Sequence, residues 1–189
     1  MITGQNNSQE PVKIYKTTDK GKNWSAIYDF NITNELKCGA FDIKFVNENV
    51  GYAECGSVNN NQSRSFLYKT TNSGNNWTMV SDLTAYGYYD IPKDGTLKLL
   101  NESTLLIFRN VSASGLVFKS TNSGSDWSTK YQMSSYLLGM ESSKIDGNTL
   151  YLYGTTGGDR PLIIKSSDFM ETYEDYSSNS LFLANGIVT

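Results

Sequence analysis

Short apolar runs separated by polar turn residues occupy most of this chain of 189 residues. Three runs follow one another at 41–45, 50–53 and 65–68, and a second set begins at 96–100. Val, Ile, Tyr and Phe are frequent in the runs, while Asn, Ser and Gly lie between them, which is typical of β-strands joined by turns. Asp146-Gly147 is a strong hairpin signal. No segment shows a convincing helical period, so the pattern predicts an all-β fold.

One eight-residue motif recurs four times with the pattern Ser/Thr-x-Asp/Asn-x-Gly-x-x-Trp. The copies run from Thr17 to Trp24, from Thr70 to Trp77, from Ser120 to Trp127 and from Ser166 to Tyr173. Their first residues lie 53, 50 and 46 positions apart. A period close to the range of about 20–50 residues indicates a repeat architecture. The fourth copy departs from the pattern, with Met170 in place of Gly and Tyr173 in place of Trp.

The motif predicts a tight hairpin turn between two strands. The side-chain oxygen at its third position accepts backbone N–H bonds of the turn, and the glycine supplies a positive φ. The tryptophan is expected to be buried between neighbouring repeats, and the fourth turn is expected to be strained or differently shaped. A lysine precedes each copy (Lys16, Lys69, Lys119, Lys165), and its repetition indicates a structural role. The structural motif residues are Thr17, Asp19, Gly21, Trp24, Thr70, Asn72, Gly74, Trp77, Ser120, Asn122, Gly124, Trp127, Ser166, Asp168 and Tyr173.

On these residues the chain resembles the Asp-box, or BNR, repeat family of sialidases, xyloglucanases, sortilin-type receptors and photosystem II assembly factors. The resemblance implies a β-propeller of about four Asp-box blades, each a four-stranded antiparallel meander. It also implies that the motif joins the third and fourth strands of a blade, as a structural device remote from any active site. The repeat therefore predicts architecture and leaves activity open.

The repeat period divides the chain, as a single propeller or propeller fragment over 1–189, into four expected blades. They are blade 1 at 1–30 with a closing strand at 181–189, blade 2 at 38–83, blade 3 at 90–133 and blade 4 at 137–178. Residues 1–4 align with the second strand of a blade, so blade 1 lacks its inner strand unless 181–184 supplies it. A closed ring and a fragment of a longer array, or half-ring that dimerises, both remain open.

Composition restricts the partners. The formal net charge of −3 argues against nucleic acid or an anionic membrane surface as a partner, and no apolar run is long enough for a membrane span. Protein or carbohydrate partners remain. An extracellular, periplasmic or cell-surface location is expected, with the leader absent from this chain. Pairing around a turn near 47–49 places Cys55 opposite a residue near Asp42, so we expect Cys38 and Cys55 to be two small thiols rather than a disulfide.

The chain contains no histidine, which excludes histidine-based acid–base chemistry, Ser-His-Asp triads and histidine metal sites. No metal site and no cofactor motif is recognised. Carboxylate, tyrosine and arginine chemistry remains. Arginines and aromatic residues are expected at the rim opposite the motif turns, and the ligand-binding candidates are Arg64, Arg109, Arg160, Tyr86, Tyr88, Tyr89, Asp90 and Tyr136.

The alternative for the arginines is exposure in loops with local carboxylate partners, and for the tyrosines it is packing between blades. Sialidases bind a sugar carboxylate through three arginines, but their Phe/Tyr-Arg-Ile-Pro signature is absent, since Phe108-Arg109-Asn110-Val111 departs from it after the arginine. No catalytic residue is assigned. The sequence favours a non-catalytic module that binds protein or glycan through one face. The alternative is a fragment of a secreted glycoside hydrolase, sialidase-like or xyloglucanase-like, with incomplete catalytic residues.

Overall fold

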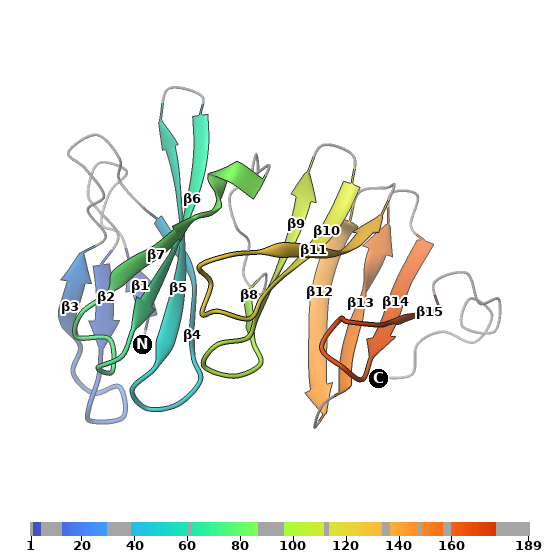
Figure 1. Cartoon of the computed structure of the whole chain (residues 1–189). Helices are drawn as coiled ribbons and strands as arrows, with labels where there is room; N and C mark the ends of the chain where they lie inside the picture. The colour runs from blue at the N-terminus through green and yellow to red at the C-terminus, as the bar shows by residue number, and fades with distance from the viewer. Residues whose placement is uncertain are drawn as a thin grey trace. The chain divides into compact units, whose positions relative to one another are not determined.

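The computed structural model describes residues 2–4, 13–29, 39–59, 62–86, 97–111, 114–133, 137–146, 149–156 and 160–176. These residues form four antiparallel sheets and one short 3-10 helix. Each sheet is a meander, because strands that follow one another in sequence are neighbours in the sheet (Figure 1). The all-β prediction is confirmed.

The first sheet contains three described strands, and the second contains four followed by the helix. In the first sheet Ile2 lies opposite Tyr15, which places residues 2–4 beside the strand that leads into the motif, as the sequence predicts. Residues 181–189, expected to close this sheet, lie outside the described residues. The elements are β1 (Ile2–Gly4), β2 (Lys13–Lys16), β3 (Ser25–Asp29), β4 (Gly39–Phe45), β5 (Gly51–Asn59), β6 (Gln62–Thr70), β7 (Thr78–Asp82) and η1 (Leu83–Tyr86).

The third and fourth sheets have four strands each. They are built from β8 (Leu97–Leu99), β9 (Leu105–Val111), β10 (Ser114–Ser120), β11 (Ser128–Met133), β12 (Leu137–Asp146), β13 (Thr149–Thr156), β14 (Arg160–Ser166) and β15 (Glu174–Asp175). The chain divides into two compact units, Met1–Ile107 with Ser120–Trp127, and Phe108–Lys119 with Ser128–Thr189.

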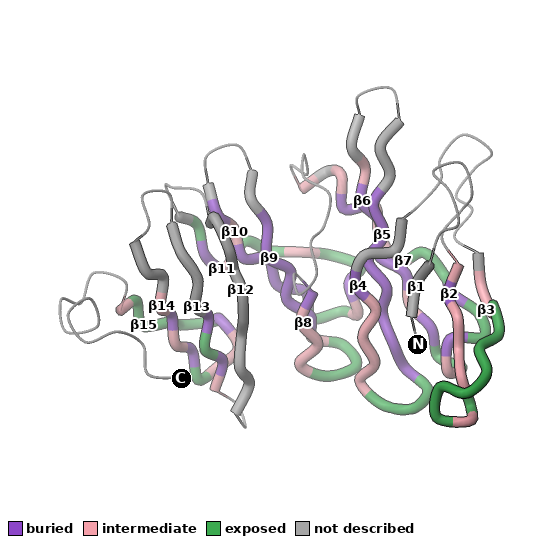
Figure 2. The backbone as a smooth tube through the Cα atoms, turned by 180° about the vertical axis from the view of Figure 1, so that it is seen from behind, coloured by how far each residue is buried: buried purple, intermediate pink, exposed green. Residues whose placement is uncertain are grey.

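The first unit has two apolar clusters. One joins Ile14 of β2 to Ala53, Phe66 and Trp77 of the second sheet. The other joins Tyr52 and Leu67 of the second sheet to residues of β8 and β9, including Leu97, Leu105 and Ile107. Buried residues lie along β5 and β6, and exposed residues lie mainly in the described turns between strands (Figure 2). Each cluster thus joins one sheet to the next, as expected where no small sheet buries an apolar face alone.

The four motif copies are called the repeat turns below (17–24, 70–77, 120–127 and 166–173). They share one pattern of hydrogen bonds to the backbone. The third-position oxygen accepts from the backbone N–H four residues later, at 2.9 Å in every copy. The first-position hydroxyl accepts from the N–H of the fifth residue, at 2.8–2.9 Å. In the first three copies the indole N–H donates to the glycine carbonyl at 3.0 Å. The turn is therefore closed by its own side chains.

The fourth repeat turn keeps this shape without its glycine. Met170 adopts φ +68°, close to the +82° of Gly74. A side chain with a Cβ is strained in this region, so the expected strain is present and the expected change of shape is not. The Met170 side chain is fully buried, and this packing opposes the backbone cost.

Burial of the tryptophans differs between repeats. Trp77 is 6% exposed and its ring meets Phe45 edge-on at 6.0 Å. Trp127 is half-buried against the second apolar cluster. Trp24 is 40% exposed, so the expectation that it is largely buried is wrong. The reason is positional: Trp77 packs with Ile14 of the preceding sheet, and no described sheet precedes the first.

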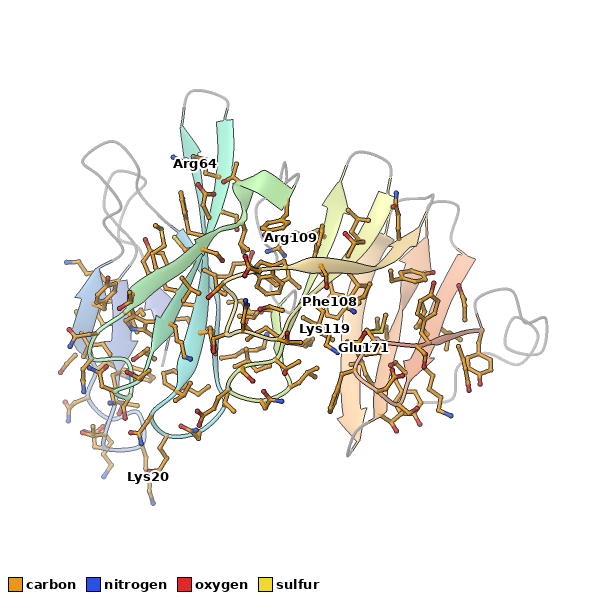
Figure 3. The ribbon with its side chains drawn as sticks, in the orientation of Figure 1. Lys20, Arg64, Phe108, Arg109, Lys119 and Glu171 are labelled. Atoms are coloured by element: carbon orange, nitrogen blue, oxygen red, sulfur yellow. The ribbon has the colours of Figure 1, made fainter. Side chains whose placement is uncertain are left out.

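Three of the repeated lysines reach the repeat turn of the following sheet. Lys16 Nζ donates to the Ser73 carbonyl at 2.9 Å, and Lys69 Nζ donates to Ser123 Oγ at 3.1 Å. Lys119, 6% exposed, donates to Glu171 Oε1 at 2.8 Å (Figure 3). The repeated lysine is thus a structural contact between successive sheets.

The cysteine expectation is wrong. Cys55 is disulfide-bonded, and the chain has one other cysteine, Cys38, which lies outside the described residues. The β4–β5 register shifts between Ala40 and Asp42, so Cys55 lies opposite Ala40. A simple hairpin without this irregularity predicts a partner near Asp42, two positions further from Cys38.

Candidate ligand-binding site

Arg64 lies at the end of the second sheet opposite its repeat turn. It is the third residue of β6 and pairs with Ser57, while Thr70 at the other end of β6 opens the turn. Figure 3 shows Arg64 at this end of the sheet and Lys20 in the first repeat turn. Because β6 is extended, its length alone separates Arg64 from the second repeat turn.

The Arg64 guanidinium is held by two neighbours. Its Nη2 donates to Asp82 Oδ2 at 2.5 Å, and its central carbon lies 5.0 Å from the centre of the Phe66 ring. The Arg64 side chain is 37% exposed. A guanidinium carries five N–H donors, more than the contact with Asp82 uses. Arg64 is therefore oriented by its neighbours while part of it faces solvent.

Asp82 and Thr84 support this arrangement. Asp82 Oδ1 accepts from the backbone N–H of Thr84 at 2.9 Å, and Thr84 Oγ1 accepts from the N–H of Ser65 at 3.2 Å. Burial raises the pKa of Asp82, but the hydrogen bonds from Thr84 and Arg64 outweigh it and leave this pKa below its ordinary value. Asp82 is therefore ionised at neutral pH and keeps the Arg64 ion pair charged.

Of the aromatic candidates, Tyr86 is the one within the described residues. It ends η1, which directly follows β7 and Asp82 at the same end of the sheet as Arg64. Tyr86 is half-buried and packs against the apolar cluster that contains Leu97 and Leu105. Packing between sheets, the alternative weighed from the sequence, thus accounts for part of its surface. Tyr88, Tyr89, Asp90 and Tyr136 lie outside the described residues.

The other two arginines differ from Arg64. Arg109 lies inside β9 with 6% of its surface exposed, and its Nη1 donates to the Phe108 carbonyl at 2.8 Å. It is therefore not an exposed loop arginine. Arg160 begins β14 and pairs with Thr156. It precedes its repeat turn by six residues, the same offset as Arg64, so the two residues occupy equivalent positions in their sheets.

A charged group between the second and third sheets was missed from the sequence. Asp42 of β4 is 8% exposed and accepts from Lys44 Nζ at 2.5 Å and from the Leu97 N–H at 3.4 Å. Burial and the charge of Lys44 lower the pKa of the neighbouring Lys98, while Asp42 opposes this shift. The alternation of Asp42 and Lys44 with apolar Ile43 signals a polar strand face, but no local pattern predicts the approach of β8.

The described residues offer two recognition chemistries. Arg64 presents a planar guanidinium that suits a carboxylate, and Lys44 with Lys98 presents cationic groups around a buried aspartate. No cluster of three metal-ligating side chains occurs among the described residues. Within the same residues, no helix is long and apolar enough to cross a membrane.

No protein-family model and no curated protein matches the chain. Among solved structures, the chain is similar to polysaccharide lyase Uly1, at 12% identity and a TM-score of 0.44 over 72% of this chain and 29% of that one. It is also similar to α-L-arabinofuranosidase Arb93A from Fusarium graminearum, solved with an iminosugar inhibitor, at 11% identity and a TM-score of 0.45 over 75% and 48%. The chain thus spans less than half of either protein. At this similarity neither an activity nor a ligand is assigned.

Proposed function

We propose that this chain is a non-catalytic Asp-box β-propeller module that binds an acidic glycan or acidic peptide through the sheet ends opposite its repeat turns. The propeller part is supported by repeated geometry. Four turns share one hydrogen-bond pattern, and three lysines make the same kind of contact with the next sheet. Each sheet is thus a structural equivalent of the others, as the blades of a propeller are.

The pairing of the two strands on either side of each of the first three repeat turns supports the same view. Its register shifts between Ile14 and Tyr15, between Leu67 and Tyr68, and between Val117 and Phe118. These pairs occupy the same position before their repeat turns. A bulge bends and twists a strand, so its repetition gives successive sheets a common shape for stacking.

The single observation that carries the binding proposal is the arrangement of Arg64. Its guanidinium is positioned by Asp82 and Phe66, remains partly exposed, and lies at the sheet end remote from the repeat turns. A positioned planar guanidinium binds a carboxylate in bidentate geometry with little ordering cost. Arg160 occupies the equivalent position in the fourth sheet.

Titration calorimetry with sialyllactose, and with neutral lactose as its uncharged counterpart, tests this proposal. Arg64→Ala should weaken binding of the acidic ligand at least tenfold, which corresponds to about 1.4 kcal/mol. Arg64→Lys should recover only part of it, because an ammonium cannot form the two parallel hydrogen bonds. Lys20→Ala, a charge deletion in the first repeat turn, is the control and should bind like the parent. Equal losses for the Arg64 and Lys20 variants would contradict the proposal.

The glycoside hydrolase fragment is the competing function. Glycoside hydrolysis ordinarily needs a protonated carboxylic acid beside a second carboxylate. Burial raises the pKa of Asp82, but hydrogen bonds from Thr84 and then Arg64 leave it below its ordinary value. Hydrogen bonds from Lys119 and Lys130 lower the pKa of Glu171, and a lowered pKa suits a charged carboxylate rather than a proton donor. We therefore expect no turnover in a single-turnover assay with sialosides and β-glucans. Sugar release that is lost on replacing a carboxylate would favour the hydrolase.

We also place the protein outside the cytoplasm, at the cell surface or in an extracellular or periplasmic space. The Cys55 disulfide supports this, because disulfides persist in oxidising compartments. Thiol labelling before and after cell permeabilisation, with fractionation of the native host, tests the location. A fully reduced cytoplasmic protein would contradict it.

A further inference from the structure

Residues of the kind that join successive sheets are exposed in the fourth and first sheets. Between the second and third sheets the contact has two sides: a lysine and an aromatic residue on one sheet, and the repeat turn with its tryptophan on the next. In the second sheet, Lys69 pairs across the strands with Tyr52. Tyr52 is fully buried, and its hydroxyl donates to the Glu102 carbonyl of the following sheet at 2.6 Å.

The fourth sheet exposes the same pair. Lys165 pairs with Tyr151 in the register that Lys69 and Tyr52 occupy. Tyr151 is 38% exposed, and the Lys165 side chain is 40% exposed with its ammonium 3.9 Å from Glu174 of the same sheet. The groups that anchor the second sheet to its neighbour are thus presented to solvent by the fourth.

The first sheet exposes the complementary side. Trp24 is 40% exposed although its turn has the hydrogen bonds of the other turns. Lys20 lies at the position of Ser73, whose carbonyl accepts from Lys16, and it has the same positive φ. Its carbonyl is therefore the equivalent acceptor for a lysine of another sheet.

We propose that this chain self-associates head to tail, with the first repeat turn of one copy docked on the Tyr151–Lys165 face of the fourth sheet of a second copy. The choice of a second copy as the occupant follows from the contact between a lysine and the next repeat turn, which occurs three times among the described residues. Charge also agrees, because Lys20 and Lys22 in the turn are exposed and Glu174, beside Lys165, has a side chain that is 61% exposed. This surface is separate from the arginine end of the sheets, so the inference goes beyond ligand binding.

A heterologous contact of this kind forms rings or open chains rather than a symmetric two-fold dimer. It therefore predicts a specific complementation experiment by analytical ultracentrifugation. The unaltered chain should show a mass that rises with concentration. Trp24→Ala, and separately the double variant Tyr151→Ala with Lys165→Ala, should each remain monomeric.

Mixing the two defective proteins provides the decisive readout. The Trp24 variant retains the fourth-sheet face and the double variant retains the first repeat turn, so an equimolar mixture should form a one-to-one heterodimer and nothing larger. Met79→Ala truncates an exposed apolar side chain outside the proposed contact, since Met79 is 50% exposed. This variant should associate like the unaltered chain. Circular dichroism checks the fold of every variant.

Hydrogen exchange of the unaltered chain gives a test that needs no substitution. Protection of peptides covering 18–26 and 150–153 should increase with protein concentration. A monomer at all concentrations, including one in which Trp24 is protected without association, would overturn the proposal. So would a mixture of the two variants that remains monomeric, or a Met79 variant that loses association as the Trp24 variant does.

Discussion

Replacing Trp77 and Trp24 separately by alanine tests how each repeat is stabilised, because the same turn stands in two environments. Trp77 is 6% exposed and contacts a cluster that includes Ile14 and Phe66, whereas Trp24 is 40% exposed. Both indoles donate to a glycine carbonyl at 3.0 Å, so the local hydrogen bond is matched. The difference between the variants therefore measures packing between sheets.

The expected magnitude follows from burial. A tryptophan buries roughly 150–250 Å², which at about 25 cal/mol per Å² gives about 4–6 kcal/mol as an upper range. Buried Trp-to-Ala substitutions typically cost about 3–5 kcal/mol, and we expect about 4 for Trp77→Ala. Trp24→Ala should cost about 2 kcal/mol, because less area is lost and water fills the space left behind.

Urea unfolding followed by far-ultraviolet circular dichroism measures both values, at neutral pH with the disulfide intact and at a concentration where the chain is monomeric. Met79→Ala is the control for an exposed residue and should fall within about 0.5 kcal/mol of the parent. Equal losses for the two tryptophans would show that packing between sheets does not stabilise the second repeat, as would a loss below about 1 kcal/mol for Trp77→Ala.

Three further predictions concern the turns and the disulfide. Gly124→Ala should lower the free energy of unfolding by about 2–4 kcal/mol, because a Cβ there meets Leu67 Cδ2 at 2.3 Å in addition to the backbone strain at φ +88°. Gly21→Ala, at φ +89° with no atom nearer to the added Cβ than 3.9 Å, should cost only about 1 kcal/mol. Equal losses for the two variants in urea unfolding would be inconsistent with this difference. Hydrogen bonds from the Asn23 backbone and the Thr17 side chain lower the pKa of Asp19 from 3.8 to about 2. The contribution of the Asp19 carboxylate to stability is therefore complete above about pH 4 and is lost as pH falls through 2. Asp19→Asn, which copies Asn72, should remove this part of the pH dependence, and a carboxyl titration by nuclear magnetic resonance with a midpoint near 3.8 would disprove the shift. Reducing the disulfide should lower the free energy of unfolding by about 3 kcal/mol, because the bond closes the loop between the two cysteines of the chain. Two thiols that react in the unreduced protein would show that no disulfide exists.

The repeat turn was predictable because its determinants are local. Thr17, Asp19 and Gly21 form hydrogen bonds within an eight-residue segment, so the sequence pattern contains the whole interaction. Asn72 and Asn122 make the same bond as Asp19, which explains why the third position tolerates either residue. The exposure of Trp24 was not predictable in this way, because burial of this tryptophan depends on a preceding sheet rather than on its own turn.

Features that depend on register or on two sheets were harder to predict. The register shift between Ala40 and Asp42 changes the partner of Cys55, and no hairpin residue in the sequence marks that irregularity. Arg109 was expected near a loop but lies within β9, since the strand continues to Val111. The approach of Lys98 to Asp42 requires β4 and β8 to pack, and strand alternation alone does not specify which strands meet.

Chemical-shift mapping with sialyllactose tests the proposed binding surface most directly. We expect perturbations at Arg64, Phe66, Asp82 and Tyr86, with the backbone amides of the repeat turns unchanged. Lactose at the same concentration should produce much smaller shifts, because it lacks the carboxylate that the guanidinium binds. Perturbations confined to residues 19–23, 72–76 and 122–126 would contradict the proposed binding surface, because the ligand would then bind at the repeat turns and not at the Arg64 end of the sheet.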